Sequence, residues 1–450
     1  MTTLRCCMAL TATKKLAVLQ ADADTAFVQA PIDKDVLIYV DQPPGHSDGT
    51  NRKMLLIKAL YGLKQAALAW FEHCRKIVVG LGFRPSDYDP CLYLRQHGEE
   101  LEMVATYVDD FLVFARTTVK ANSILDELET KMKLKRQGEM SFFLGIKIEY
   151  DQNDGKITLT QEAHARKILA RFGMTTCHGY TTPEVDDRED LWHDSSQPST
   201  DQETYRSMVG SLMYLMTCTR PDISHAVQRL SRHLHDPRVP HAIGAKRVLR
   251  YVKHTIGTGL IFRSPDANLV GYCDASWATR PDRRSTTGFA CFVGGGIVSW
   301  KSARQRVVAL STCGAEYVAL AELAKEVVWL RGLLEDMNMK QEQATLTWCD
   351  NKAAISTAEN VGVASRSKHI QANVLDLRHV GTADQLADVL TKVSTRAAID
   401  KFKTVAMHPE NKNGMKQLDE ISQSEDDSYQ VKSQTAPSLR STSRTNTGEC

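Results

Sequence analysis

Three aspartates sit where strands of the predicted fold would end. Asp109 and Asp110 separate two apolar runs, 101–107 and 111–115, which are typical of a β-hairpin, and Asp22 follows a third apolar run. Carboxylates beside buried strands are costly to desolvate unless cations meet them. Three of them could hold two divalent metals about 4 Å apart and activate a hydroxyl for phosphoryl transfer. The alternative is that Asp109-Asp110 is only a solvated turn, which aspartate favours.

A second set of acids lies in the C-terminal half of the chain. Asp274 and Asp350 close two apolar runs, Glu316 begins a long helical pattern, and Asp388 lies in the last helical pattern. Taken singly, each acid has an ordinary interpretation as a helix cap, a turn residue or a surface charge. Brought together at one edge of a sheet, the four could bind two Mg²⁺ ions. Such a centre directs water at a phosphodiester and needs no nucleophile from the protein.

The elements that must position this second set follow a clear order. Strand-like runs occupy 269–273, 287–293 and 297–300, and a long helical pattern covers 312–337. The next elements are a strand at 345–349, a short helix from 351, a strand at 374–380 and a helix over 384–392. Three strands followed by alternating helices and strands predict an α/β sandwich with a mixed sheet.

The rest of the chain divides by composition. Residues 1–175 mix short strands with helices, 176–203 is an acidic linker, 204–265 is helical, 266–393 is the α/β sandwich, and 394–450 is mostly a disordered tail. The segment 184–203 contains eight acids and one arginine. Two basic stretches, 280–306 with six Lys/Arg and 246–253 with four, are either footprints for phosphate or solvated faces.

Composition and targeting signals narrow the class of protein. The 450 residues are 42% hydrophobic and 24% charged with a net charge of +2, which excludes a wholly disordered, collagenous or coiled-coil chain. There is no apolar run of about 18 residues, and Lys14 and Lys15 interrupt the N-terminal apolar patch. The eleven cysteines form no Cys-x-x-Cys pair. We therefore expect an intracellular protein, neither secreted nor held at a membrane.

Short motifs surround the first set of acids. They are DADTAF at 22–27, KALYGLKQA at 58–66, YVDD at 107–110, FFLGI at 142–146, GSLMYL at 210–215 and TRPDI at 219–223. In this order they resemble the reverse transcriptase of copia-type LTR retrotransposons, within that family's Pol polyprotein. The resemblance implies a palm built from an antiparallel sheet with helices.

The resemblance also assigns residues. Asp22, Asp109 and Asp110 correspond to the palm carboxylates that bind the catalytic metals. Phe27 corresponds to the steric gate that excludes a ribose 2′-hydroxyl, the alternative being a plain core phenylalanine. Tyr61, Gly62 and Lys64 correspond to residues lining the pocket for nucleotide and template.

A second series of motifs resembles the same family's ribonuclease H. It comprises GYCDASWA at 271–278, DRRSTTG at 282–288, AEY at 315–317, CDN at 349–351 and QLADVLTK at 385–392. By this resemblance Asp274, Glu316, Asp350 and Asp388 bind metal. Arg366, Lys368 and His369 in SRSKHI would contact substrate phosphate, the alternative being a solvated basic loop.

The sequence also departs from the family pattern. The family's polymerase begins upstream of the position of Met1 with a fingers region that clamps the triphosphate, and Asp24 replaces a family lysine beside Asp22. Proline is replaced by Ala67 and by Val393. After Ile370 a helix and turn of the family are missing, which should leave Asp388 less well placed. These departures predict a truncated copy with weakened polymerase activity.

The resemblance implies an RNA-directed DNA polymerase (a nucleotidyltransferase) with ribonuclease H (endonuclease) activity, located in the cytoplasm (in a virus-like particle) or in the nucleus. The cofactor would be Mg²⁺ or Mn²⁺, with no small-molecule cofactor. The partners would be an RNA template, an RNA–DNA hybrid and deoxynucleotide triphosphates. One alternative is a catalytically dead relic that still binds nucleic acid through the basic stretches, and another is a domesticated interaction module. Salt-dependent binding without turnover distinguishes the relic from the enzyme.

Overall fold

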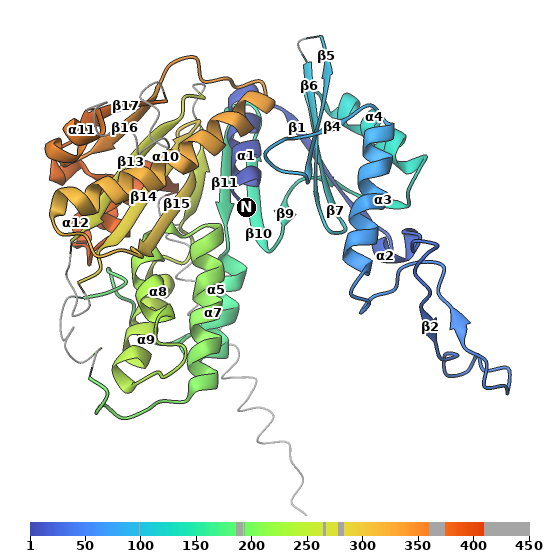
Figure 1. Ribbon diagram of the computed structural model, residues 1–450, viewed down its shortest axis with the longest axis horizontal. Coiled ribbons are helices and arrows are strands. Elements are labelled where there is room, and N and C mark those ends of the chain that lie inside the picture. The colour runs from blue at the N-terminus through green and yellow to red at the C-terminus, as the bar shows by residue number, and fades with distance from the viewer. Residues whose placement is uncertain are drawn as a thin grey trace, which may run out of the picture.

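The structure, a computed structural model, describes residues 1–98, 100–185, 192, 194–263, 267–277, 283–359 and 374–408. It has two lobes (Figure 1). The first lobe holds most of the N-terminal 140 residues, and the second holds the other described residues together with the N-terminal helix. Within the described residues, every helix is too short or too polar to cross a bilayer.

The first lobe is built on a six-stranded antiparallel sheet in the order β4-β5-β6-β7-β1-β8. Its strands are β1 (Ala17–Ala23), β4 (Arg84–Pro85), β5 (Leu92–His97), β6 (Glu100–Tyr107), β7 (Asp110–Ala115) and β8 (Leu134–Glu139). Alternate residues serve two cores: Leu19 and Val113 pack under the helices of this lobe, whereas Val18 and Phe114 face the second lobe. Because both faces are covered, the sheet is a rigid support for the side chains at its ends.

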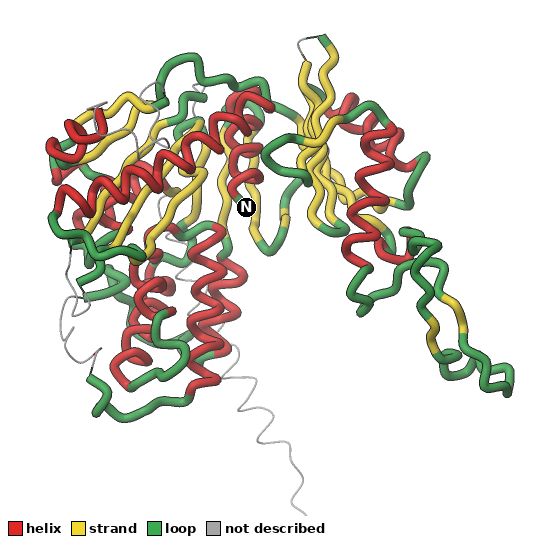
Figure 2. The backbone as a smooth tube through the Cα atoms, in the orientation of Figure 1, coloured by secondary structure: helices red, strands yellow, loops and turns green. Residues whose placement is uncertain are grey.

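Three helices cover the outer face of this sheet, on the side away from the second lobe (Figure 2). They are α2 (Ala26–Gln29), α3 (Ala66–Gly80) and α4 (Thr118–Glu129). Helix α4 begins at Thr117, whose side chain accepts a hydrogen bond from the backbone N–H of Lys120. Strands β6 and β7 match the hairpin predicted from the sequence.

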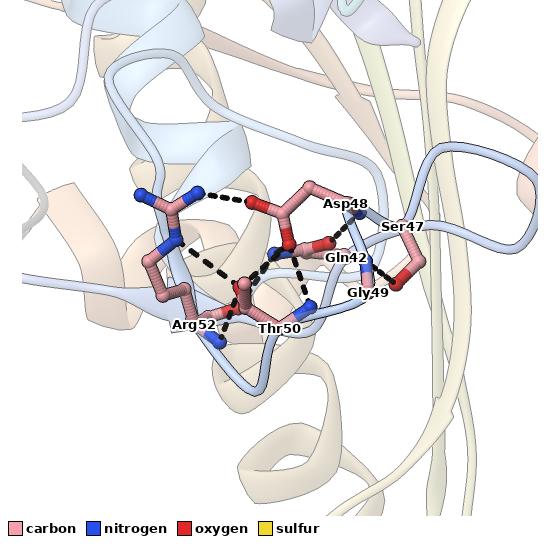
Figure 3. A network of polar contacts seen from close by, with 6 residues as sticks. All are labelled: Gln42, Ser47, Asp48, Gly49, Thr50 and Arg52. Atoms are coloured by element: carbon pink, nitrogen blue, oxygen red, sulfur yellow. Dashed lines mark hydrogen bonds and ion pairs between the residues drawn. The ribbon is translucent and has the colours of Figure 1, made fainter.

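A two-stranded ribbon of β2 (Tyr39–Val40) and β3 (Met54–Leu55) extends from the first lobe. The loop at its end is organised around the Asp48 carboxylate (Figure 3). Asp48 accepts hydrogen bonds from the Thr50 backbone N–H at 3.0 Å and from the Gln42 amide at 2.9 Å, and it pairs with Arg52. Hydrogen bonds from Thr50 and Gln42 hold the pKa of Asp48 well below its usual range.

A second antiparallel sheet joins segments that are far apart in sequence, in the order β18-β12-β11-β10-β9. Its strands are β9 (Phe142–Phe143), β10 (Ile146–Asp151), β11 (Lys156–Thr160), β12 (Gly259–Phe262) and β18 (Met407–His408). Strand β12 lies in a region that the sequence predicted as helical. Strand β18 and helix α12 (Arg396–Ala406) lie in the predicted tail, so the first part of that tail is folded.

Helix α1 (Thr2–Lys14) lies near the centre of the molecule and is buried from Leu4 to Ala12 (Figure 1). Its Arg5 side chain donates hydrogen bonds to the carbonyls of Val298 at 2.6 Å and Thr217 at 2.8 Å. The Arg5 guanidinium also stands 4.0 Å from the centre of the Trp300 ring. The N-terminal helix therefore ties together elements from the second half of the chain.

A helical layer supports the second lobe from below in the view of Figure 1. It consists of α5 (Glu162–Arg171), α7 (Gln202–Cys218), the 3₁₀ turn η1 (Pro221–Ile223), α8 (Ser224–Ser231) and α9 (Val239–His254). At its centre a buried Arg220–Asp222 ion pair, with N···O distances of 2.9 and 2.8 Å, accepts a further hydrogen bond from the Tyr251 hydroxyl at 2.7 Å. The TRPDI motif is thus a structural element that joins α7, α8 and α9.

The third sheet is mixed, as predicted, in the order β15-β14-β13-β16-β17. Its strands are β13 (Val270–Ser276), β14 (Thr286–Val293), β15 (Gly296–Arg304), β16 (Thr345–Cys349) and β17 (Leu375–His379). β13, β14 and β15 are antiparallel, whereas β16 runs parallel to both β13 and β17. Helices α10 (Thr312–Asp336) and α11 (Lys352–Glu359) follow the predicted order.

One element of this region differs from the prediction. The helix expected over 384–392 is instead two short 3₁₀ turns, η3 (Thr382–Asp384) and η4 (Leu386–Leu390). Between them Gln385 is extended, and its side chain accepts a hydrogen bond from the Ala387 N–H while donating to the Cys273 carbonyl at 2.8 Å. The long-range bond to β13 interrupts the helix, and no local pattern in the sequence records it.

Candidate active sites

The first set of acids meets at the edge of the six-stranded sheet. Asp22 near the end of β1 is the register partner of Asp110 at the start of β7. Asp109 lies in the two-residue turn between β6 and β7, and its carbonyl accepts a hydrogen bond from the Ala23 N–H at 2.7 Å. The hairpin therefore brings all three predicted carboxylates to one sheet edge.

Backbone strain accompanies these acids. Val108, immediately before Asp109, has φ 57°, and Thr25, three residues after Asp22, has φ 51°. β-Branched residues rarely adopt this left-handed region, because the branch crowds the backbone. The Trp70 indole on α3 donates a hydrogen bond to the Val108 carbonyl, so packing from outside the hairpin holds the strained turn. Strain that the surroundings enforce is a common feature of functional sites.

Burial and mutual repulsion raise the pKa values of two of these acids. Burial and the neighbouring Asp109 charge raise the pKa of Asp22, while Lys135 acts to lower it. Burial and the charges of Asp109 and Asp22 likewise raise the pKa of Asp110. Lys135 is the register partner of Asp22 on β8, and no local sequence pattern pointed to it.

Of the four predicted pocket residues, two are in ring contact. The rings of Phe27 on α2 and Tyr61 in the loop before α3 have centroids 4.6 Å apart. Gly62 follows with φ 94°, a conformation that favours glycine, and Lys64 is exposed. Phe27 is half-buried: it packs against the core of this lobe and stays partly open to solvent.

The second set of acids converges at the ends of β13 and β16. Among the described residues, two groups of three possible metal ligands have atoms that all lie within 4.8 Å of one another. One group is Asp274, Asp350 and Asp388, and the other is Glu316, Cys349 and Asp350. All four predicted acids are therefore brought together, with Asp350 common to both groups. The three acids of the first lobe do not form such a compact group within the described residues.

These acids are buried, which shapes their electrostatics. Asp274 is 3% exposed and Glu316 is 5% exposed. Burial together with the Asp388 charge raises the pKa of Asp274 to about 7. Burial and the Asp274 charge raise the pKa of Glu316 to about 10, and burial raises that of Asp388 as well. The centre is thus a concentration of negative charge that favours either protons or cations.

Neighbouring side chains orient the second set. The Lys392 ammonium pairs with Asp388 at 2.8 Å, and the Thr391 hydroxyl donates to Asp274. The Thr382 hydroxyl donates to Asp350 at 3.1 Å. The backbone N–H of Ala275 donates to Glu316 at 3.0 Å. None of these partners was predicted from the sequence. The signal that could have found Thr391 and Lys392 is their place in the QLADVLTK motif.

Several basic residues that were predicted to contact phosphate either lie outside the described residues or hydrogen-bond within the protein. Arg366, Lys368 and His369 lie outside the described residues, as does part of the basic stretch 280–306. In the stretch 246–253, three of the four basic side chains contact the protein itself. Arg247 donates to the Thr182 hydroxyl at 2.9 Å, Arg250 to the Tyr180 hydroxyl at 3.1 Å, and Lys253 to the Cys177 carbonyl at 2.8 Å.

Comparisons with known proteins find a reverse transcriptase family and proteins of transposons. The family described as reverse transcriptase (RNA-dependent DNA polymerase) matches residues 1–186. The retrovirus-related Pol polyprotein from transposon RE1 of Arabidopsis thaliana is 35% identical over 416 residues, 89% of this chain and 28% of that protein. A putative transposon Ty5-1 protein of Saccharomyces cerevisiae is 34% identical over 311 residues, 68% of this chain and 100% of that protein.

The chain is similar to only part of the larger relatives. It spans about 28% to 32% of the length of three plant transposon Pol polyproteins. A crystal structure of prototype foamy virus protease–reverse transcriptase aligns with 84% of this chain and 44% of that one. The sequence identity is 10% and the TM-score 0.21, so that likeness carries no argument.

Proposed function

The chain belongs to the reverse transcriptase family, among the Pol polyproteins of copia-type LTR retrotransposons, and on that premise we propose two phosphoryl-transfer activities for it. The first lobe would be an RNA-directed DNA polymerase. The mixed sheet of the second lobe would be a ribonuclease H-like domain that cleaves the RNA strand of an RNA–DNA hybrid. The observation that carries the proposal is the convergence of Asp274, Asp350 and Asp388 within 4.8 Å, with Glu316 beside them.

The donor set of the second centre fits a hard divalent cation. Carboxylate oxygens are the ligands that Mg²⁺ takes, and Mn²⁺ accepts them as well. Among the described residues, no hydrogen-bond donor reaches the buried Glu316 Oε2 or the buried Asp388 Oδ1. Buried oxygens without donors are costly unless an ion meets them. We therefore assign Asp274, Glu316, Asp350 and Asp388 as the residues that hold the cations.

The protein's own residues would orient the reaction at this centre. A divalent cation, when bound, would supply Lewis-acid activation of water and charge stabilisation at the phosphate. Asp350 belongs to both ligand groups and would be the residue shared between two cation positions. Lys392, 2.8 Å from Asp388, would balance the negative charge of the acids. Thr391 and Thr382 would fix the carboxylates of Asp274 and Asp350 by hydrogen bonds.

The polymerase proposal has the hairpin geometry as its support. Asp22, Asp109 and Asp110 share one sheet edge, and Asp22 and Asp110 are register partners. Their spacing is looser than that of the second set, so we propose that cations and the bound nucleotide draw them together. Phe27, whose ring lies tilted beside that of Tyr61, would discriminate against a ribose 2′-hydroxyl, and Gly62 and Lys64 would line the same pocket.

A catalytically dead relic that binds nucleic acid is the competing proposal. Its support in the sequence includes the two basic stretches 246–253 and 280–306, but in the first of them Arg247, Arg250 and Lys253 each make a contact within the protein. The acceptors of those hydrogen bonds are neutral, so the stretch keeps its charge, but they occupy donors that phosphates would otherwise take. The enzyme proposal is therefore the stronger of the two.

The test uses the purified full chain with a labelled RNA–DNA hybrid that has a recessed primer, in Mg²⁺ and deoxynucleotides. Asp109→Asn and Asp350→Asn variants accompany it, each removing one charge from one centre. We expect primer extension to be lost only in Asp109→Asn and RNA cleavage only in Asp350→Asn. Binding of the hybrid without either product would overturn the enzyme proposal and leave the relic.

A further inference from the structure

The second centre contains a ligand that its carboxylates do not explain, the thiol of Cys349. Its sulfur atom and one oxygen each of Glu316 and Asp350 all lie within 4.8 Å of one another. Cys349 is fully buried at the end of β16, and Asp350 follows it directly. Parallel pairing of β16 with β13 sets Cys273, also fully buried, beside Cys349 on the neighbouring strand.

The buried Glu316 carboxylate, which the proposed Mg²⁺ centre also uses, points to a ligand at this group. Glu316 is 95% buried, being 5% exposed, and its Oε1 accepts the Ala275 N–H at 3.0 Å. Its other oxygen, Oε2, is buried and meets no hydrogen-bond donor among the described residues. A buried carboxylate with one unmet oxygen, beside a thiol and a second carboxylate, is the donor set of a cation site rather than of a packed core.

The chemistry of the donors selects the class of cation. Mg²⁺ takes oxygen ligands and does not favour sulfur, whereas Zn²⁺ binds cysteine thiolate together with carboxylate oxygens. The atoms around one tetrahedral zinc ion lie roughly 3.5 Å apart, so small side-chain rotations would close this group on the ion. Three protein ligands would leave the fourth position to water.

We propose that Glu316, Cys349 and Asp350 form a binding site for a thiophilic divalent cation such as Zn²⁺, beside the oxygen-only group of Asp274, Asp350 and Asp388. On binding, the S–H bond of Cys349 breaks, a sulfur–zinc bond forms, and the proton passes to solvent. Because the sites share Asp350, Zn²⁺ competes with Mg²⁺. That competition makes Zn²⁺ an inhibitor of RNA cleavage, a consequence that rests on the proposed function, whereas the binding itself does not.

The binding test follows absorption of the metal-free full chain during titration with Co²⁺, a spectroscopic substitute for Zn²⁺. Coordination by sulfur produces a thiolate-to-cobalt charge-transfer band in the near ultraviolet. We expect one equivalent of Co²⁺ to produce the band, a stoichiometric amount of Zn²⁺ to remove it, and Mg²⁺ to remove it only in large excess, because the two sites share Asp350. Binding of Co²⁺ without the band would overturn the proposal.

Cysteine variants identify which sulfur atom binds the cation. Cys349→Ser should lose the band, whereas Cys74→Ser should keep it, since Cys74 is an equally buried thiol in the first lobe. Cys273→Ser should also keep the band. Loss in Cys273→Ser with retention in Cys349→Ser would overturn the assignment of Cys349.

A further variant covers the case in which Cys349→Ser does not fold. Glu316→Gln keeps the thiol and the shape of the side chain, and it should weaken Co²⁺ binding by at least about tenfold. Unchanged affinity would overturn the site. RNA cleavage is measured separately in Mg²⁺: a cobalt band without cleavage leaves this site standing while the proposed function fails, and cleavage without a band does the reverse.

Discussion

Glu316 and Asp274 are carboxyl groups that the fold removes from water and places beside other acids. At the hairpin of the first lobe, Asp22 and Asp110 keep more contact with solvent, and Lys135 offsets part of their repulsion. Carboxyl groups therefore occur in two environments, partly exposed at the hairpin and buried at the second centre. The buried groups allow the stronger prediction about stability, because burial amplifies each uncompensated charge.

We expect Glu316→Gln to stabilise the metal-free protein. Burial and the Asp274 charge raise the pKa of Glu316 to about 10, above its unfolded value. A raised folded pKa gives stability that is fully present below the unfolded pKa and is lost as pH rises through the folded one. In EDTA the free energy of unfolding of the unsubstituted protein should thus fall between about pH 5 and 9, more steeply than that of the variant.

Urea unfolding at several pH values, with and without Mg²⁺, measures this effect. Mg²⁺ should stabilise the unsubstituted protein and stabilise Glu316→Gln less, because one ligand charge is gone. Glu322→Gln is the control: Glu322 lies on the same helix, but its pKa is lowered to about 2 by hydrogen bonds from Lys301 and Lys325. Parallel pH profiles for the unsubstituted protein and Glu316→Gln would contradict the prediction.

The residues at both centres show what a sequence can predict at this scale. The acids themselves were predicted because each belongs to a local motif. Partners such as Lys135 and Thr382 were not, because sheet pairing and loop packing bring them close only in the folded chain. Cys349 lies in a predicted motif, yet its closeness to Glu316 across 33 positions of sequence required the fold.

Elements that carry their own periodicity were predicted more reliably than those that depend on distant partners. The succession of strands along the chain in the third sheet, and helix α10 among them, followed from local patterns. Strand β12 pairs with β11 and with β18 across long separations, so nothing nearby in sequence marked β12 or β18. The two 3₁₀ turns η3 and η4 replaced the predicted helix because Gln385 bonds to β13.

The TRPDI element yields a prediction of stability. Arg220→Met leaves the fully buried Asp222 charge without its partner, so we expect a loss of about 3–5 kcal/mol in the free energy of unfolding. Burial acts to raise the pKa of Asp222, but the Arg220 charge outweighs it, so that pKa lies below its usual range. The pair's stabilisation is therefore present above the unfolded pKa and is lost as pH falls through the folded one.

Chemical unfolding at neutral and acid pH measures this effect. The difference between the unsubstituted protein and Arg220→Met should shrink as pH falls. It shrinks first where the folded variant protonates its buried, unpaired Asp222, above the usual pKa of about 4, and further below about 4, where the ion pair itself is protonated. A double variant, Arg220→Met with Asp222→Leu, should lose less stability than the two single losses combined, since no charge stays buried. Additive losses would show that the pair is not coupled.

Arg5 on helix α1 also contributes to the stability of the fold. Burial lowers the pKa of Arg5 to about 10, so its guanidinium is still charged at neutral pH and donates to the Val298 and Thr217 carbonyls. Arg5→Met should destabilise the protein by roughly 1–3 kcal/mol for each buried carbonyl left without a donor. Arg75→Met, at an exposed position on α3, is the control and should change thermal unfolding little. Equal melting temperatures for the two variants would contradict the role of Arg5.

At the scale of the whole molecule, the two candidate centres belong to lobes that dock directly. The Asp336 carboxylate at the end of α10 accepts hydrogen bonds from Ser86 at 2.6 Å and pairs with Arg84 at 2.9 Å. The indole of Trp329 donates to the Tyr88 carbonyl at 3.2 Å. The loop after β4 thus holds the first lobe against the long helix that positions Glu316.

Close approach at this interface depends on one glycine. A Cβ at Gly332 of α10 would stand 1.9 Å from the Tyr88 ring, whereas a Cβ at Gly210, on the exposed face of α7, would meet nothing within 4 Å. In an unhindered helix, Gly→Ala raises the free energy of unfolding by about 0.5–1 kcal/mol, because alanine restricts the unfolded chain. We therefore expect this gain for Gly210→Ala and a loss for Gly332→Ala, measured by urea unfolding.

The Tyr88 side chain decides whether that loss comes from the docking of the lobes. Adding Tyr88→Ala to Gly332→Ala removes the clash, so the double variant should be more stable than the sum of its single changes predicts. Tyr88→Ala with Gly210→Ala should be additive, since those sites share no contact. Equal gains for Gly332→Ala and Gly210→Ala would mean that the Tyr88 ring moves aside without cost. In that case the two centres would be joined by the Asp336 contacts and the shared core rather than by a close fit at Gly332.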